Sequence, residues 1–314
     1  DKYMIKIENT VLASPEQMEF IIQGMRNPMN SWGKSDSYEN YSVEFDDDLP
    51  GVEIRHPYYR VGAGDISLMQ RLANAGTDHR KFMRMMPVYV RITAPLYWWK
   101  EFDVYKVGTV ANSCSTMHKI QDKEFTLEDF STEQLYYVDQ EMEDYIEANE
   151  GRDHLTCVNP MYLMNEVVGT LNYYRNHWIS CDKALKVNEI YGANPEEQRK
   201  RIKAAQKKYW WQMIQLLPSS YNQTRNVMMN YEVLANIYKS RKNHKLDEWV
   251  EFCAWVKTLP YSELICGEEA IMTPNEQREK LEEVADKFCE IGNINPLSKE
   301  EIEQSVNLFR MKEN

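Results

Sequence analysis

The spacing of apolar residues along the chain predicts one clear strand and many helices. Val88, Val90 and Ile92 alternate with more polar positions, which is the pattern of a half-buried strand. The run that follows, Leu96-Tyr97-Trp98-Trp99, is expected to begin a helix. Further along the chain the pattern is almost wholly helical, and we expect helices over 132–149, 160–178, 195–216, 222–241, 246–258, 275–290 and 298–311.

The beginning of the chain carries a helix start and a long polar stretch. Ser14 is placed to cap a helix that runs through Met25, and Gln17 is placed to complete a capping box. Residues 27–48 are polar and irregular, so we expect a long loop. Loops of that length are often functional, and this one is a candidate lid.

Two glycines, Gly62 and Gly64, look like the opening of a dinucleotide-binding fingerprint. The third glycine of that fingerprint is missing, because Ser67 stands in its place. A strand, a turn and a short helix over residues 66–75, capped by Asp65, explain the same residues without a nucleotide.

These elements indicate an α+β fold, in which a modest antiparallel sheet is surrounded by many helices and the C-terminal two thirds are rich in helix. The chain has 314 residues, and we expect a single domain over 1–314. No internal repeat and no low-complexity linker divides it.

Charge and cysteine content narrow the classes of partner. The 37 lysines and arginines and 49 aspartates and glutamates sum to −12, which opposes general binding to a polynucleotide or to an anionic membrane. A small anionic nucleotide needs only a local basic pocket and remains possible. The six cysteines form no CxxC pair, and with no signal peptide they indicate reduced thiols in a cytoplasmic protein. Cys114 and His118 lack a second pair with zinc-like spacing, so no metal site is expected.

Two segments of the chain keep a register that belongs to one family. One runs from His79 through Thr93-Ala94-Pro95 to Asn112-Ser113-Cys114-Ser115, and the other runs from Leu217-Pro218 through Asn230 and Leu234 to Arg241. Together they resemble the flavin-dependent thymidylate synthases, the ThyX class. That family has a Gly-His segment, a strand ending near Ala-Pro, the motif RHRxxSxNxxSxRY and a later LPxxxxTxxxxxxNxRSLxxFLxLR. The resemblance covers residues 65–260, between an N-terminal region over 1–64 that contains the long loop and a helical extension over 261–314.

The resemblance implies a ligand set and a site. It implies FAD as cofactor, a dUMP-like nucleotide as substrate, methylenetetrahydrofolate and NADPH as co-substrates, and a homotetramer with sites between subunits. Its cofactor-binding residues would be His79, Lys106 and Arg241. Its substrate-binding residues would be Asn112, Ser115, Asn230 and Arg225. Imidazole and guanidinium groups suit a ring and a diphosphate, but no catalytic residue is identified and no metal is implied.

Several arginines of the family are replaced. Met117 stands where the signature ends in Arg-Tyr, Glu232 stands at the arginine of RSL, and Glu251 stands at the arginine of the family's later EIR. A carboxylate in place of a cation reverses the interaction with phosphate, and each lost contact costs about 1.5–3 kcal/mol. The substitute cations in the sequence are Arg26, Arg175 and Arg225.

Five of these site residues also have a simpler interpretation. His79 would be a surface or capping histidine, and Lys106 a solvated lysine. Arg241 would complement the dipole at the end of a helix. Asn112 and Ser115 would cap backbone groups in a turn.

Three hypotheses follow. The first is a divergent flavin-dependent thymidylate synthase that converts dUMP to dTMP. The second keeps the fold but binds or modifies a different pyrimidine nucleotide, as the reversed charges at Glu232 and Glu251 suggest. The third is a non-catalytic scaffold or interaction protein, which the loss of the signature arginines suggests.

Overall fold

The computed structural model describes residues 4–45, 53–135, 159–187 and 194–267. These residues form two compact units. Unit 1 comprises residues 1–11 and 89–228, and unit 2 comprises residues 12–88 and 229–314. Each unit is described by itself. The expectation of a single domain stays a prediction.

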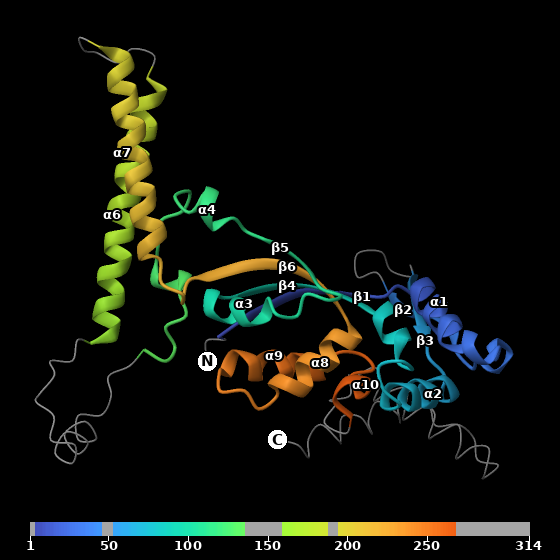
Figure 1. Ribbon diagram of the computed structural model, residues 1–314. Coiled ribbons are helices and arrows are strands. Elements are labelled where there is room, and N and C mark those ends of the chain that lie inside the picture. The colour runs from blue at the N-terminus through green and yellow to red at the C-terminus, as the bar shows by residue number, and fades with distance from the viewer. Residues whose placement is uncertain (1–3, 46–52, 136–158, 188–193, 268–314) are drawn as a thin grey trace, which may run out of the picture. The chain divides into compact units, whose positions relative to one another are not determined.

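Unit 1 contains most of a four-stranded sheet with the order β1-β4-β6-β5 (Figure 1). The strands are β1 (Lys6–Leu12), β4 (Pro87–Pro95), β5 (Val110–Ser113) and β6 (Asn222–Asn230). In β4 the side chains of Val88, Val90 and Ile92 are buried while Tyr89 is 48% exposed, which confirms the predicted alternation. β5 and β6 pair antiparallel.

The helix expected after this strand also forms. Helix α3 (Leu96–Phe102) begins where β4 ends, and its backbone N–H groups at Leu96 and Tyr97 donate to carbonyl groups of Tyr221 and Ser219. The rings of Trp98, Trp99 and Phe102 are fully buried and meet at centroid distances of 4.9–5.3 Å. These tryptophans are therefore core residues of unit 1.

Two long helices of unit 1, α6 (Pro160–Lys186) and α7 (Pro195–Leu216), lie side by side (Figure 1). Helix α7 has the expected bounds of 195–216. Helix α6 begins at the expected residue 160 and continues past the expected end at 178. A buried cluster joins them to the preceding segment through Ile120, Phe125, Phe130, Met164, Leu171 and Met213. Short elements in that segment are α4 (Thr116–Lys119) and η4 (Leu127–Asp129).

Unit 2 combines helices with a two-stranded antiparallel sheet. Its helices are α1 (Pro15–Arg26), α2 (Ala63–Asn74), α8 (Tyr231–Arg241), α9 (Asp247–Lys257) and α10 (Glu263–Cys266). Its strands are β2 (Tyr38–Phe45) and β3 (Glu53–Arg60), and its short 3-10 helices are η1 (Asn27–Met29), η2 (Trp32–Lys34) and η3 (Lys81–Met85). The capping box at α1 is confirmed, because Ser14 Oγ accepts from the Gln17 N–H and Gln17 Oε1 accepts from the Ser14 N–H.

Three expected elements are wrong. Residues 27–48 are not one long loop, since they contain η1, η2 and strand β2. Residues 222–241 are not one helix, because 222–230 form strand β6 and only Tyr231–Arg241 is helical. Asp65 does not cap α2. That helix begins at Ala63, and Asp65 lies inside its first turn, buried in an ion pair.

The remaining helix expectations are mixed. Helix α9 agrees with the expected 246–258. Residues 132–135 form a turn, while 136–149, 275–290 and 298–311 lie outside the described residues. The α+β class is confirmed: the described part of the chain holds a small antiparallel sheet among many helices. Within that part, no helix combines the length and the apolar character needed to cross a bilayer.

Candidate functional site

The residues expected to bind ligands are distributed over both units. Unit 1 holds Lys106, Asn112, Ser115 and Arg225, and unit 2 holds His79, Asn230 and Arg241. Their local geometry is given unit by unit.

Strands β5 and β6 bring Asn112 and Arg225 onto neighbouring positions of one ladder. Asn112 pairs with Asn226, and Ser113 pairs with Arg225. Because side chains alternate between the two faces of a strand, Asn112 and Arg225 point to opposite faces of the sheet. Asn226 therefore shares a face with Asn112, and sequence reasoning missed it because it placed residue 226 on a helix.

Arg225 lies on a strand and not on the expected helix, and its charge is already compensated. Its Nη1 lies 2.7 Å from Asp103 Oδ1, its Nε donates to Gln223 Oε1 at 2.9 Å, and its guanidinium carbon lies 4.3 Å from the Trp99 ring centroid. The side chain is only 14% exposed. These contacts fix the guanidinium against the aromatic core of unit 1.

Ser115 and Lys106 occupy the two ends of the β5 segment. Ser115 Oγ accepts from the His118 N–H at 3.1 Å and so caps α4, as the simpler interpretation predicts. Lys106 is exposed in the turn that precedes β5. An exposed ammonium group at that position is accessible to an anionic ligand.

The other two substitute cations also have structural partners. Arg175 donates from Nε to the Gln121 carbonyl at 2.9 Å and from Nη2 to the Asp122 carbonyl at 3.4 Å. Arg26 forms a buried ion pair with Asp65. All three substitute cations therefore contribute to the packing of the unit that contains them.

In unit 2, helix α8 carries a predicted residue at each end. Asn230 is buried at the N-cap position, where its Oδ1 accepts from the Val233 N–H at 3.0 Å. Arg241 is the last residue of the helix. Its guanidinium carbon lies 4.9 Å from the Trp249 ring centroid and its Nη1 lies 2.8 Å from His244 Nε2. Arg241 thus lies at the end of a helix, as its simpler interpretation predicts, and Asn230 caps the start of the same helix.

His79 lies in an exposed turn that Gly76 allows. Gly76 adopts φ +105°, a conformation that favours glycine, and its carbonyl accepts from the N–H groups of His79 and Arg80. The imidazole is exposed, so it is accessible to a ligand.

The neighbouring Arg80 and Arg84 form a cluster with Glu232 that sequence reasoning missed. Arg80 Nε lies 3.2 Å from Glu232 Oε1, Arg84 Nε donates to Oε2, and Arg84 Nη2 lies 3.3 Å from Oε1. Arg80 also donates to Asn236 Oδ1 at 3.1 Å. The side chains of Arg80, Arg84 and Glu232 are 18%, 50% and 11% exposed. We call these three residues the Arg–Glu cluster.

The Arg–Glu cluster carries excess positive charge. Two guanidinium groups face one carboxylate, so the three side chains sum to +1, while the exposed Asp78 acts on Arg84 from farther away. The hydrogen bond from Arg84 lowers the pKa of Glu232 against the opposing effect of burial, and Arg80 adds to the lowering. Glu232 is therefore ionised at neutral pH, and both of its carboxylate oxygens accept hydrogen bonds from arginine side chains. The signal in the sequence was Arg80 and Arg84 one turn apart, but their partner is about 150 positions away.

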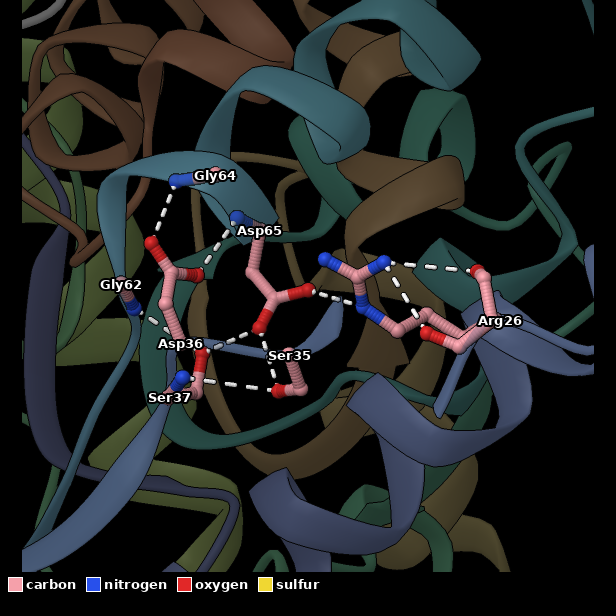
Figure 2. Close-up of polar contacts among 8 residues, drawn as sticks. Arg26, Ser35, Asp36, Ser37, Gly62, Gly64 and Asp65 are labelled. Atoms are coloured by element: carbon pink, nitrogen blue, oxygen red, sulfur yellow. Dashed lines mark hydrogen bonds and ion pairs between the residues drawn. The ribbon is translucent and has the colours of Figure 1, made fainter. Parts of the chain in front are cut away.

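A second polar network surrounds Asp65 (Figure 2). Arg26 Nε donates to Asp65 Oδ1 at 2.6 Å, and the hydroxyl groups of Ser35 and Ser37 donate to Oδ2 at 2.6 Å each. Burial would raise the pKa of Asp65, but these hydrogen bonds outweigh it and hold that pKa below its ordinary value. A buried carboxylate is tolerated here because three donors of unit 2, one of them a cation, hydrogen-bond to it.

Asp36 explains the two glycines at the start of α2. Its carboxylate accepts from the N–H groups of Gly64 at 2.7 Å and Asp65 at 3.0 Å (Figure 2). A Cβ atom added to Gly62 would lie 2.2 Å from Asp36 Cγ, so only glycine leaves room for this close approach. The chain's own carboxylate thus occupies the helix N-terminus, in agreement with the rejection of the dinucleotide fingerprint.

Metal and thiol chemistry find little support in the described residues. No group of three or more His, Cys, Asp or Glu side chains there is placed to hold a metal ion. Cys114, Cys181, Cys253 and Cys266 are free thiols. Burial, with Cys266 nearby, raises the pKa of Cys253 to about 12, so that thiol is unreactive at neutral pH.

Comparisons with known proteins give fold-level similarity only. No protein-family model matches the chain, and no curated protein matches it. Among solved structures, the chain is similar to the flavin-dependent thymidylate synthase ThyX from Helicobacter pylori complexed with FAD and dUMP, with a TM-score of 0.44 and 14% identity over 85% of this chain and 99% of that chain. A second structure of that enzyme with FAD and dUMP gives a TM-score of 0.44 and 15% identity over 86% and 99%.

The structure of a methylase is also similar. The UMP/dUMP methylase PolB from Streptomyces cacaoi, bound with 5-Br dUMP, has a TM-score of 0.42 and 11% identity over 87% of this chain and 99% of that chain. Since all three TM-scores are low, we infer function from the residues of this chain.

Proposed function

We propose that this protein is a flavin-dependent enzyme that methylates a uridylate-type nucleotide, converting dUMP to dTMP with methylenetetrahydrofolate and NADPH, as a homotetramer. The observation that carries the proposal is the Arg–Glu cluster. At the position where the resemblance places a phosphate-binding arginine, the chain has Glu232, and this carboxylate is held by two arginines.

This arrangement changes how the replacement of the family's arginine by Glu232 affects phosphate binding. A bare carboxylate would repel a nucleotide phosphate. With Arg80 and Arg84 bound to it, Glu232 instead orients two guanidinium groups, and the net charge of the cluster is the same as that of a single arginine. Arg84 is half exposed, so its guanidinium is accessible to a phosphate oxygen.

Local structure elsewhere in the two segments agrees with the register of the resemblance. The expected strand and the helix after it are present as β4 and α3. Asn230 and Arg241 delimit one helix, α8, so the spacing between them is a property of a single rigid element. These features support the alignment on which the proposed residue roles depend.

The donor set fits an anionic flavin cofactor. His79 and Lys106 are exposed, and Trp249 and His244 hold the Arg241 guanidinium in place. In the proposal, Arg241 binds the FAD diphosphate, His79 contacts the flavin, and Lys106 supplies positive charge near the ring. Asn112, Ser115, Asn230 and Arg225 orient the nucleotide. When bound, the flavin supplies hydride transfer, while these residues bind and orient.

The activity assay is tritium release from dUMP labelled on its ring. After reconstitution with FAD, the full chain should release tritium only when methylenetetrahydrofolate and NADPH are both present. A protein that binds FAD and dUMP yet releases no tritium with the complete mixture would contradict thymidylate synthesis.

A variant tests the Arg–Glu cluster itself. Arg84→Gln should weaken dUMP binding about tenfold or more, because a charged hydrogen bond is worth about 1.5–3 kcal/mol. The matched control is Arg71→Gln, an exposed arginine on α2 whose Nε donates to the Ser67 carbonyl, and it should bind dUMP like the parent. Equal loss in both variants would mean that the effect is general electrostatics and not a specific contact.

A second candidate function is binding or modification of a different pyrimidine nucleotide. The compensation of Arg225 by Asp103 favours it, because this leaves one cation fewer for a uridylate phosphate. A thermal-shift panel of pyrimidine nucleosides and nucleotides separates the two candidates. Greater stabilisation by another pyrimidine than by dUMP would favour the second.

A further inference from the structure

Unit 2 contains a cavity of about 500 Å³ that includes none of the seven residues proposed to bind FAD or the nucleotide. One wall is a face of α1, with Glu19, Gln23 and Arg26 at helical spacing. The other walls include Trp32, Ser35 and Tyr59. Cavities of about 300–1,000 Å³ are the usual size of small-molecule sites.

Arg26 provides a fixed hydrogen-bond donor in this cavity. Its side chain is only 7% exposed, so the guanidinium cannot turn away into water. Nε donates to Asp65, and Nη1 donates to the carbonyl and hydroxyl oxygens of Ser31 at 3.3 Å each. The hydrogen bonds of Arg26 to the described residues involve only Nε and Nη1, and none involves Nη2. The two N–H groups of Nη2 can therefore donate to an acceptor in the cavity.

The charges around the cavity disfavour an anionic ligand. The positive charge of Arg26 is balanced by Asp65, and Glu19 adds a further carboxylate. Burial raises the pKa of Tyr59, and Glu19 and Asp65 raise it further, so its hydroxyl stays protonated. The net charge of Arg26, Asp65 and Glu19 is −1, which opposes a phosphate or a carboxylate.

Glu19 provides an acceptor on the same wall. Its Oε1 accepts from Gln23 Nε2 at 3.1 Å, and its Oε2 has no hydrogen bond to the described residues. The indole of Trp32 is 51% exposed, and its Nε1 donates to Asn27 Oδ1 at 2.8 Å, which fixes the ring beside the cavity. The cavity therefore combines a donor, an acceptor and an aromatic surface.

We propose that this cavity binds a neutral planar heterocycle in which a carbonyl group lies beside an N–H or amino group. The carbonyl accepts from Arg26 Nη2, the N–H or amino group donates to Glu19, and the ring lies against Trp32. Guanine rings and pterin rings share this chemistry. The proposed site depends only on the geometry of unit 2 and not on the proposed enzyme activity.

Isothermal titration calorimetry of the full chain tests the proposal with guanosine, neopterin and adenosine. Guanosine or neopterin should bind, and adenosine, which lacks the carbonyl, should bind at least tenfold more weakly. Binding of guanosine alone identifies a nucleobase ligand, and binding of neopterin alone identifies a pterin. Adenosine binding as tight as the others, or no binding of guanosine and neopterin, would overturn the proposal.

Variants locate the binding. Glu19→Gln and Trp32→Ala change exposed side chains, so the fold should persist, and each should weaken binding at least tenfold. The matched control is Phe20→Ala, a 66% exposed aromatic residue on α1 that does not line the cavity, and its affinity should be unchanged. Unchanged affinity in both cavity variants would overturn the assignment.

Discussion

At the residue scale, the arginines of this chain act mainly by holding carboxylates and aromatic rings. Arg26 pairs with Asp65, and Arg80 and Arg84 pair with Glu232. Arg225 pairs with Asp103 while its guanidinium lies over the Trp99 ring. Only the group around Glu232 has more cations than carboxylates. Among these three groups, it is therefore the strongest candidate for an anion contact.

The buried pair of Arg26 and Asp65 gives a stability prediction. Arg26→Met should lower the free energy of unfolding by about 3–5 kcal/mol, because it leaves the fully buried Asp65 without its cation. The double variant Arg26→Met with Asp65→Leu should recover much of that loss, since no unpaired charge remains. Urea denaturation measures both. A double variant no more stable than the single one would show that the pair contributes more than charge compensation.

Gly62 gives a second prediction at this scale. Gly62→Ala should destabilise the protein by about 1–3 kcal/mol, because the added Cβ would lie 2.2 Å from Asp36 Cγ and 2.5 Å from its carbonyl oxygen. Gly33→Ala is the matched control, since nothing lies within 4 Å of its Cβ position. Thermal melts compare the two. Equal melting temperatures would mean that Asp36 moves aside freely.

Acid sensitivity follows from the two depressed carboxyl pKa values. The pKa of Asp65 lies below its ordinary value of 3.8, and that of Glu232 lies below 4.5. The unfolded chain therefore binds protons more readily, so their contribution to stability is present above these ordinary values and is lost as the pH falls through the folded-state values. Denaturation midpoints measured against pH should drop there. Glu232→Gln should flatten part of that drop, and an unaltered pH profile in this variant would contradict the assignment.

At the element scale, local signals were read correctly where the sequence carried a cap or a clear period. The capping box at Ser14, the alternation in β4 and the bounds of α7 all follow from neighbouring residues. Strand β6 was misread because it lies directly before α8, and its apolar residues suit either period. Its strand character comes from pairing with β5, more than 100 positions earlier, and no local pattern reports that.

The same reason limited prediction of the candidate site. Arg241 was placed correctly at the end of a helix, whereas Asn230, expected inside that helix, ends strand β6 and caps α8. The partners of Glu232 could not be inferred, because Arg80 and Arg84 reach it only after unit 2 has folded. Long-range contacts of this kind leave no periodicity in the sequence.

The α6–α7 pair gives a prediction at the element scale. Leu171→Ala should cost about 2–5 kcal/mol of unfolding free energy, because this leucine is fully buried in the cluster that joins the two helices. Leu163→Ala on the same helix is 54% exposed and should change it by less than about 0.5 kcal/mol. Denaturant titration of both variants checks the contrast. Similar costs would mean that Leu163 is covered in solution.

At the scale of the whole molecule, the net charge is −12, so any anion-binding site must be a local region of positive charge that is an exception to this balance. The proposed function requires such exceptions at Arg241, at Lys106 and in the Arg–Glu cluster, which together lie in both units of the chain. Binding of FAD is the property on which all the proposed residue roles depend.

The most direct measurement is the visible absorbance of the full chain after it has been mixed with FAD and desalted. We predict that the protein retains the yellow flavin band, and that Arg241→Ala loses it while the control Arg71→Ala keeps it. A parent protein that emerges colourless would contradict the account.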